Sequence, residues 1–323
     1  MIVRSLPSLP TSVLLVAGLA ACQPTEPAQE TNPPADALVE ATVDAPNGTY
    51  VVELSAVETG TEDFAFLAPP EIPSGWITFR MKNQGEQPHF MLLRRLPDGI
   101  TFGDYTEEVT RPFGALYARY QAGEMGRAEM LQELGGALPA WFASSPAMGG
   151  VGLTAPGRTA QATVLLECGD YVMECYVVSP EGQFHSSLGM LRPLIVTSDP
   201  SGASPPEADV EITLSNYELV VEGELTRGEQ TVRVDVEDQA EGLVGHSVHL
   251  ARLDEGTRIE EVVKWMDWVD ALRSPAPVEF LGGAEEVPSG QTTFLTVNLE
   301  PGRYAWISEG YGARGMVKEF TIR

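Results

Sequence analysis

Four residues in the first half of the chain have side chains that could bind one metal ion together. His89 comes first, and Cys175, His185 and Met190 follow within the single segment YVMECYVVSPEGQFHSSLGM. A thiolate, two imidazoles and a weak thioether are the donors that suit copper in one-electron transfer. Since no other set of residues in the sequence offers comparable chemistry, the functional interpretation depends on these four.

The elements that must position these side chains are mostly strands. His89 opens a strand, and Cys175 ends one that starts at Tyr171. Runs of alternating or β-branched residues bounded by Gly, Pro and Asp are typical of strands. They occur at Thr49–Glu58, Trp76–Asn83, His89–Leu96, Ala162–Glu167, Tyr171–Val178 and Leu191–Thr197.

One helical tract interrupts these strands. Apolar residues recur at three- and four-residue steps between Tyr105 and Leu138, which predicts helix. Gly123 and Gly126 are expected to divide the tract into two short helices. We expect the pair Gly149 and Gly150 to return the chain to loop.

The second half of the chain repeats the order of the first. The segment HFMLLRRLPDG of the first half aligns with HSVHLARLDEG of the second half, which places His246 opposite His89. Met316 aligns with Met190, but Ser308 takes the place of the cysteine and Tyr311 stands where a second histidine would be. A serine hydroxyl is a poor copper ligand, so the sequence predicts tandem copies of one all-β domain with a copper site in the first copy alone.

Three features of the chain resemble the cupredoxin superfamily of blue copper proteins. Asn83-x-Gly85-x-x-x-His89 opens a strand, a Leu-Glu-x-Gly-x-Tyr turn leads into the strand that ends at Cys175, and Met190 follows His185 after four residues. The resemblance covers both halves. It implies an all-β fold of two tandem Greek-key β-sandwich domains, each with a helical insertion.

The resemblance also implies a role for each matching residue. His89, Cys175 and His185 would be equatorial ligands of one type 1 copper, and Met190 would be the axial ligand. Asn83 would hold the ligand loops together by side-chain hydrogen bonds. The loop between Cys175 and His185 is longer than in the small electron carriers of the superfamily and is similar to that of the blue-copper domains of nitrite reductases.

The N-terminus predicts a lipid anchor. Residues 1–21 are expected to be a signal peptide, and Leu19-Ala20-Ala21-Cys22 resembles the lipobox of bacterial lipoproteins, which implies lipidation of Cys22. Residue 23 is Gln rather than Asp, which by resemblance favours the outer membrane, facing the periplasm. Residues 22–40 would form a disordered tether. We expect domains at 41–198 and 208–323, with the Pro- and Ser-rich segment 199–207 as linker.

The net charge and the motifs of the sequence exclude several classes of function. A formal net charge of −26 disfavours nucleic acid and suits a basic redox partner such as a cytochrome. No catalytic constellation is found, and Glu174 stands where a copper nitrite reductase needs a histidine, so we expect no enzymatic activity. The sequence favours an envelope-anchored electron-transfer protein. A metal-free structural or adaptor lipoprotein and a copper storage or delivery protein stay open as alternatives.

Overall fold

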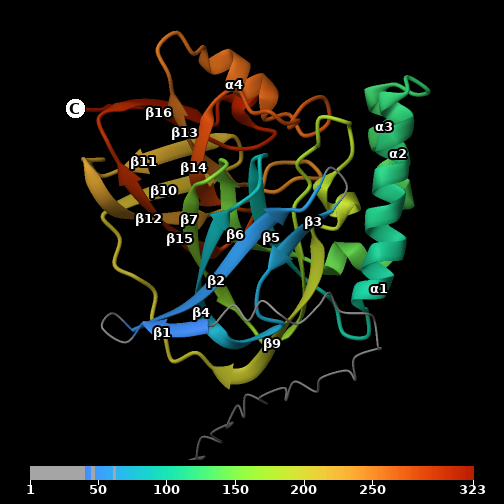
Figure 1. Cartoon of the computed structure of the whole chain (residues 1–323), viewed down its shortest axis with the longest axis horizontal. Coiled ribbons are helices and arrows are strands. Elements are labelled where there is room, and N and C mark those ends of the chain that lie inside the picture. The colour runs from blue at the N-terminus through green and yellow to red at the C-terminus, as the bar shows by residue number, and fades with distance from the viewer. Residues whose placement is uncertain (1–40, 45–47, 61–62) are drawn as a thin grey trace, which may run out of the picture.

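The computed structural model describes residues 41–44, 48–60 and 63–323 (Figure 1). The predicted signal peptide, the lipidation of Cys22 and the tether lie outside the described residues. Within the described part of the chain, no helix combines the length and the hydropathy that a membrane span requires.

Strands dominate both halves of the chain, which confirms the all-β prediction. Those of the first half are β1 Ala41–Asp44, β2 Thr49–Glu58, β3 Phe64–Leu67, β4 Glu71–Asn83, β5 His89–Arg95, β6 Ala147–Thr154, β7 Thr159–Leu166, β8 Gly169–Glu174 and β9 Leu191–Pro200. Those of the second half are β10 Val210–Ser215, β11 Glu218–Glu222, β12 Gly228–Val236, β13 Val248–Leu253, β14 Glu279–Ala284, β15 Gln291–Leu299, β16 Gly302–Ile307 and β17 Val317–Ile322.

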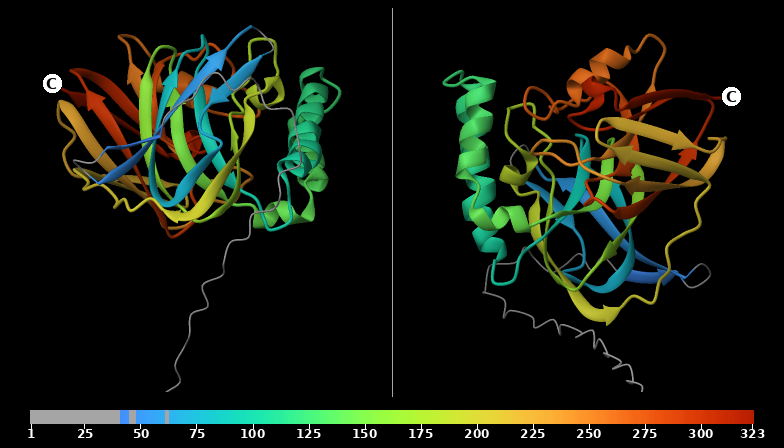
Figure 2. Two further views of the ribbon diagram at one scale, coloured as in Figure 1. Left: turned by 60° about the horizontal axis from the view of Figure 1, so that its bottom comes forward. Right: turned by 180° about the vertical axis from the view of Figure 1, so that it is seen from behind.

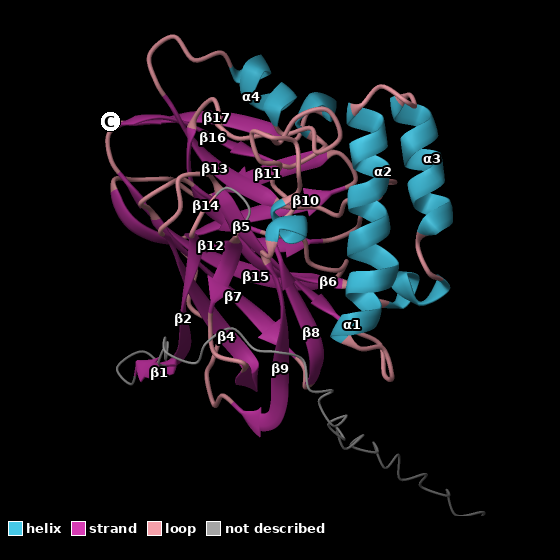
Figure 3. Ribbon diagram, turned by 45° about the vertical axis from the view of Figure 1, so that its right-hand side comes forward, coloured by secondary structure: helices cyan, strands magenta, loops and turns pink. Residues whose placement is uncertain are grey.

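The helical tract lies between β5 and β6, as the sequence predicts. It consists of α1 Phe102–Tyr105, a π-helical turn Thr106–Thr110, α2 Arg111–Gln121, α3 Arg127–Ala137 and a short 3-10 helix Ala140–Ser144. Gly123 has a φ of +73° in the turn between α2 and α3, a conformation that glycine adopts without strain. The shorter helix α4, Ile259–Trp265, occupies the corresponding place between β13 and β14. Figure 3 shows α2 and α3 standing side by side against one side of the strands.

The strand pairing of the first half recurs in the second half. The parallel pair β2–β4 corresponds to β10–β12, and the antiparallel pairs β4–β7, β5–β8 and β8–β9 correspond to β12–β15, β13–β16 and β16–β17. The internal repeat inferred from the sequence therefore extends to the hydrogen-bonding order of the strands.

Both sheets continue from one half into the other (Figure 2). One array of paired strands has the order β11-β10-β12-β15-β7-β4-β2, with β1 and β3 at its outer edge, and the other has the order β9-β8-β5-β6-β14-β13-β16-β17. The start of β4 also pairs in parallel with β9 and joins the two arrays. The strands of the two halves pair directly with each other, β7 with β15 and β6 with β14, both antiparallel. The boundaries at 198 and 208 stay predictions. Residues 201–208, between β9 and β10, are neither helix nor strand.

The prediction of a loop around Gly149 and Gly150 is wrong, because these residues belong to β6. Gly152 approaches Gly283 of β14 so closely that a Cβ at residue 152 would lie 2.7 Å from the Gly283 Cα. A Cβ at Gly150 would lie 1.8 Å from the Met91 carbonyl oxygen. The glycines therefore permit a close approach of neighbouring backbones rather than a turn.

Candidate metal centre

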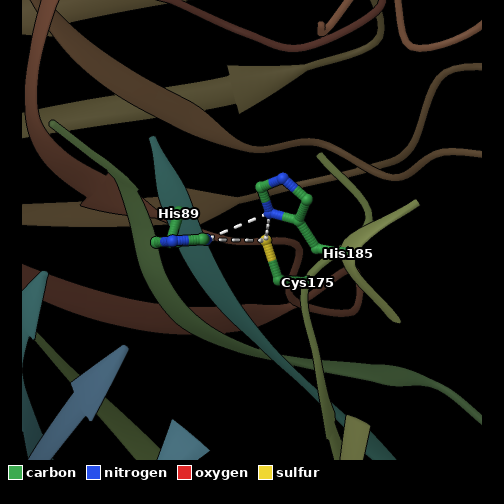
Figure 4. A group of neighbouring side chains, drawn as sticks. All are labelled: His89, Cys175 and His185. Carbon is green, nitrogen blue, oxygen red and sulfur yellow. Dashed lines mark hydrogen bonds between the residues drawn. The ribbon is translucent and has the colours of Figure 1, made fainter. Parts of the chain in front are cut away.

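The side chains of His89, Cys175 and His185 converge in the interior of the first half (Figure 4). The Cys175 Sγ lies 3.6 Å from Nδ1 of His185 and 4.0 Å from Nδ1 of His89, and the two Nδ1 atoms are 3.0 Å apart. All three residues have an exposed fraction of 0%. In the described part of the chain, no other group of three or more His, Cys, Asp or Glu side chains is placed to hold a metal ion.

Paired strands and a short turn bring the three residues to one end of the fold. His89 is the first residue of β5, and Cys175 directly follows β8, its antiparallel neighbour. His185 begins a 3-10 turn that ends at Leu188. The His185 backbone N–H donates to the Val177 carbonyl at 2.8 Å, which returns the chain toward the cysteine.

Met190 lies at the same end of the fold and is fully buried. Its N–H donates to the His185 carbonyl at 2.9 Å, and its carbonyl accepts from the Cys175 N–H at 3.2 Å. Gly189 precedes it with a φ of +110°, and a Cβ there would lie 2.6 Å from the Phe64 carbonyl oxygen. The residue expected as axial ligand is thus bonded through its backbone to two of the expected equatorial ligands.

The second nitrogen of each imidazole is already engaged. Nε2 of His89 lies 2.8 Å from Oε1 of Glu58, and Nε2 of His185 lies 3.1 Å from Oε1 of Gln87. Both partners are oxygens that accept, so each Nε2 carries the ring proton. The Nδ1 lone pairs then face each other and the Cys175 sulfur. Two nitrogen lone pairs 3.0 Å apart repel each other unless a cation lies between them, and the thiol has only one proton to offer, so this arrangement fits a bound metal ion.

Burial sets the protonation of the three groups in the absence of a metal. It lowers the pKa of both histidines, and the neighbouring His89 lowers that of His185 further. The hydrogen bond from His89 to Glu58 opposes this effect only in part. Burial also raises the pKa of the Cys175 thiol. The histidines are therefore neutral, as ligands must be, and a metal ion would have to displace the thiol proton.

Glu58 and Gln87 are contacts that sequence reasoning missed. Gln87 could have been noticed, because it lies two residues before His89. Glu58 could not, since it is the last residue of β2. The parallel pairing of Ala56 with Asn83 is what brings the end of β2 beside the loop that precedes His89.

Asn83 is buried at the start of that loop. Its Nδ2 donates to the carbonyls of Gln87 and Thr154, both at 2.8 Å, and its Oδ1 accepts from the Gly85 N–H at 2.9 Å. These bonds fix the shape of the loop that delivers His89 and tie it to β6. Among the described residues, no hydrogen bond joins the Asn83 side chain to the loop between Cys175 and His185.

Backbone hydrogen bonds from the second half fix the long loop between Cys175 and His185 in place. The N–H of Val178 donates to the Leu272 carbonyl, and the N–H of Ser274 donates to the Val178 carbonyl, both at 2.9 Å. Helix α2 covers the same loop, since the ring of Tyr117 packs on Phe184 with centroids 4.3 Å apart. The loop is therefore fixed from two sides despite its length.

The residues aligned with the ligands in the second half form no comparable group. His246 is buried, and its Nε2 accepts from the Ala240 N–H at 3.3 Å. The ring of Tyr311 packs edge-on against this imidazole, where a second histidine would be needed. Ser308 is also buried. These side chains fill the corresponding position with packing contacts.

Comparisons with known proteins give distant structural similarities. No protein-family model matches the chain, and no curated protein matches its sequence. Auracyanin A, a "blue" copper protein from Chloroflexus aurantiacus, matches at 20% identity and a TM-score of 0.28, over 46% of this chain and 100% of its own. Dithionite-reduced auracyanin from Roseiflexus castenholzii matches at 21% identity and a TM-score of 0.27, over 49% and 99%.

A multicopper oxidase matches over a larger part of the chain. Its identity is 14% and its TM-score 0.23, over 85% of this chain and 88% of its own. Similarities of this strength do not assign a function. The metal centre is therefore inferred from the donor geometry of His89, Cys175 and His185.

Proposed function

We propose that this protein binds one type 1 copper ion in its first half and transfers single electrons. His89, Cys175 and His185 would be the strong ligands, and Met190 the weak axial one. The observation that carries the proposal is the convergence of one thiol and two Nδ1 atoms within 4.0 Å, with both Nε2 protons directed elsewhere. A trigonal His₂Cys set with a distant thioether is the donor arrangement of blue-copper electron-transfer sites.

Copper, when bound, would supply the one-electron change between Cu(I) and Cu(II). The contribution of the chain itself is to fix the positions of the sulfur and nitrogen ligand atoms. His89 and Cys175 lie at the ends of paired strands, and the loop carrying His185 is fixed by α2 and the second half. Because the donors are held and water is excluded, little rearrangement would accompany a change of charge at the metal.

We further propose that the chain is anchored in the cell envelope through a lipid on Cys22, facing the periplasm from the outer membrane. The lipobox-like sequence and the polar stretch that follows it support this proposal. The net charge of −26 supports a basic redox partner, such as a cytochrome. We propose no catalytic activity for the chain.

A copper storage or delivery protein would use the same ligands but release Cu(I) readily. The full burial of all three donors favours slow exchange and hence electron transfer. Competition with a Cu(I) chelator separates the two functions, because a carrier that must release copper would lose it within the time of mixing. A metal-free structural lipoprotein would bind no copper at stoichiometric level.

Titration of the purified protein with Cu(II) tests the proposal. We expect one copper per chain and an intense visible band from thiolate-to-copper charge transfer. Cys175→Ser should abolish the band, whereas His246→Gln, which changes the aligned histidine of the second half, should leave it intact. A folded wild-type protein that binds copper substoichiometrically and stays colourless would overturn the proposal.

A further inference from the structure

The contact between Glu58 and His89 places a carboxylate directly behind one of the proposed copper ligands. Oε1 of Glu58 lies 2.8 Å from Nε2 of His89, and only 9% of the Glu58 side chain is exposed. The same oxygen accepts the backbone N–H groups of Glu86 at 3.0 Å and Gln87 at 2.9 Å. Three N–H donors therefore point at one oxygen atom.

This geometry favours the ionised form of Glu58. An oxygen that accepts three hydrogen bonds is stabilised as a carboxylate, because each donor interacts more strongly with the charged form. Beside His89 there is accordingly a fixed negative charge.

The loop before His89 is shaped to keep that charge in place. A Cβ at Gly85 would lie 2.3 Å from Oε1 of Glu58 and 2.9 Å from Nε2 of His89. Any side chain at residue 85 would therefore displace the carboxylate from the imidazole. His185 has a different partner, since its Nε2 meets the neutral amide oxygen of Gln87. Only one of the two histidines thus has an anionic neighbour.

We propose that Glu58 is a positioning residue that makes His89 a more electron-rich ligand and stabilises Cu(II) relative to Cu(I). This inference rests on the proposed function. A carboxylate that accepts the outer N–H of a metal-bound histidine raises the basicity of the ring and fixes its tautomer. It also adds a negative charge near the metal in a poorly screened interior, where the doubly charged ion gains more than the singly charged one.

Glu58→Gln tests the proposal, because the amide oxygen can still accept from Nε2 while the charge is lost. We expect the ratio of Cu(I) to Cu(II) affinity to rise by about tenfold, which for a one-electron couple raises the reduction potential by about 59 mV. The measurements are redox titration of the visible band and, separately, chelator competition for each oxidation state.

Glu86→Gln is the matched control. It removes the same charge from an exposed side chain in the same loop, and we expect its potential to stay close to that of the wild type. Equal shifts in the two variants would overturn the proposal, since they would reflect net charge alone. So would an unchanged potential in a blue Glu58→Gln protein.

A wild-type protein without the charge-transfer band would instead contradict the proposed function, and the role of Glu58 with it. If a variant does not bind copper, its reduction potential cannot be measured. The hydrogen bond between Glu58 and His89 is then tested in the copper-free protein by NMR of the histidine ring protons. We expect a slowly exchanging His89 Nε2–H in the wild type and in Glu58→Gln, and its loss in Glu58→Ala. A proton that exchanges equally fast in all three would contradict the positioning role.

Discussion

Single polar contacts determine which nitrogen each histidine would offer to a metal ion. In both imidazoles Nε2 is bonded to an oxygen, so the lone pair that is left belongs to Nδ1 and points toward Cys175. The two contacts differ in charge. Glu58 provides a carboxylate to His89, whereas Gln87 provides an amide oxygen to His185.

Gln87→Leu should weaken copper binding, because it removes the acceptor that orients the His185 ring. Loss of a partner of this kind typically lowers metal affinity by about 10–100-fold. Cu(II) affinity measured by competition with a chelator checks this expectation. Gln84→Leu is the control, since the exposed Gln84 bonds to Ser55 rather than to a ligand. Equal affinities in wild type and Gln87→Leu would show that the ring needs no such support.

The sequence could single out the residues that we propose as ligands but not what surrounds them. Cys175, His185 and Met190 lie in one segment, and His89 opens a recognisable strand, so residue types and their order indicated the group that the structure brings together in His89, Cys175 and His185. Glu58 is remote in sequence, and only the parallel pairing of β2 with β4 places it beside His89. Which residues bond to the proposed ligands depends on strand register. The sequence alone does not give that register for residues such as Glu58.

At the scale of elements, the strands and the helical tract follow the sequence pattern closely, but β6 does not. The predicted strand Thr49–Glu58 agrees with β2 at both ends. The segment Ala147–Thr154 contains three glycines, a composition typical of loops, yet it forms a central strand. Its glycines lie against the backbones of β5 and β14 on either side, and the local sequence does not encode these contacts.

Gly152→Ala tests this explanation. The added methyl would meet the Gly283 backbone at 2.7 Å, so the pairing of β6 with β14 must shift. We expect a loss of about 1–3 kcal/mol in the free energy of unfolding, measured by chemical denaturation. Gly135→Ala makes the same change within α3, where no atom lies within 4 Å of the new Cβ, and should stabilise by about 0.5–1 kcal/mol. A neutral Gly152→Ala would contradict the close-contact explanation.

At the scale of the whole molecule, the two halves bury acidic groups where they meet. Glu285 follows β14 and bonds through its N–H to the Gly150 carbonyl of the first half, and Glu309 follows β16. Both side chains are fully buried, and the carboxyl oxygens of Glu285 have no hydrogen-bond partner among the described residues, while Glu309 lies near the Tyr176 hydroxyl. Burial lowers the pKa of the nearby His249 to about 3, so its imidazole is neutral and does not stabilise the ionised form of either carboxyl.

These carboxyls should make stability fall as the pH rises. Burial raises the pKa of Glu285 and Glu309 well above the ordinary value, and the neighbouring acidic groups raise it further. Above the ordinary carboxyl pKa, the folded chain therefore holds protons that the unfolded chain has released. Their contribution to the free energy of unfolding is therefore larger at about pH 5 than at about pH 8, whereas the buried histidines, whose pKa is lowered, act in the opposite direction.

The double variant Glu285→Gln and Glu309→Gln provides the control, because amides cannot ionise. Between about pH 5 and about pH 8, its free energy of unfolding in chemical denaturation should rise more, or fall less, than that of the wild type. A variant with the same pH dependence as the wild type would show that the two carboxyls are not protonated in the folded chain.

X-ray absorption at the copper edge tests the central claim most directly, because it reports the atoms bound to the metal. In the protein loaded with one copper per chain, we expect one short copper–sulfur bond and two copper–nitrogen bonds from imidazoles. The sulfur contribution should vanish in Cys175→Ser. A wild-type spectrum with only nitrogen and oxygen neighbours would contradict the assignment of His89, Cys175 and His185 as a type 1 copper site.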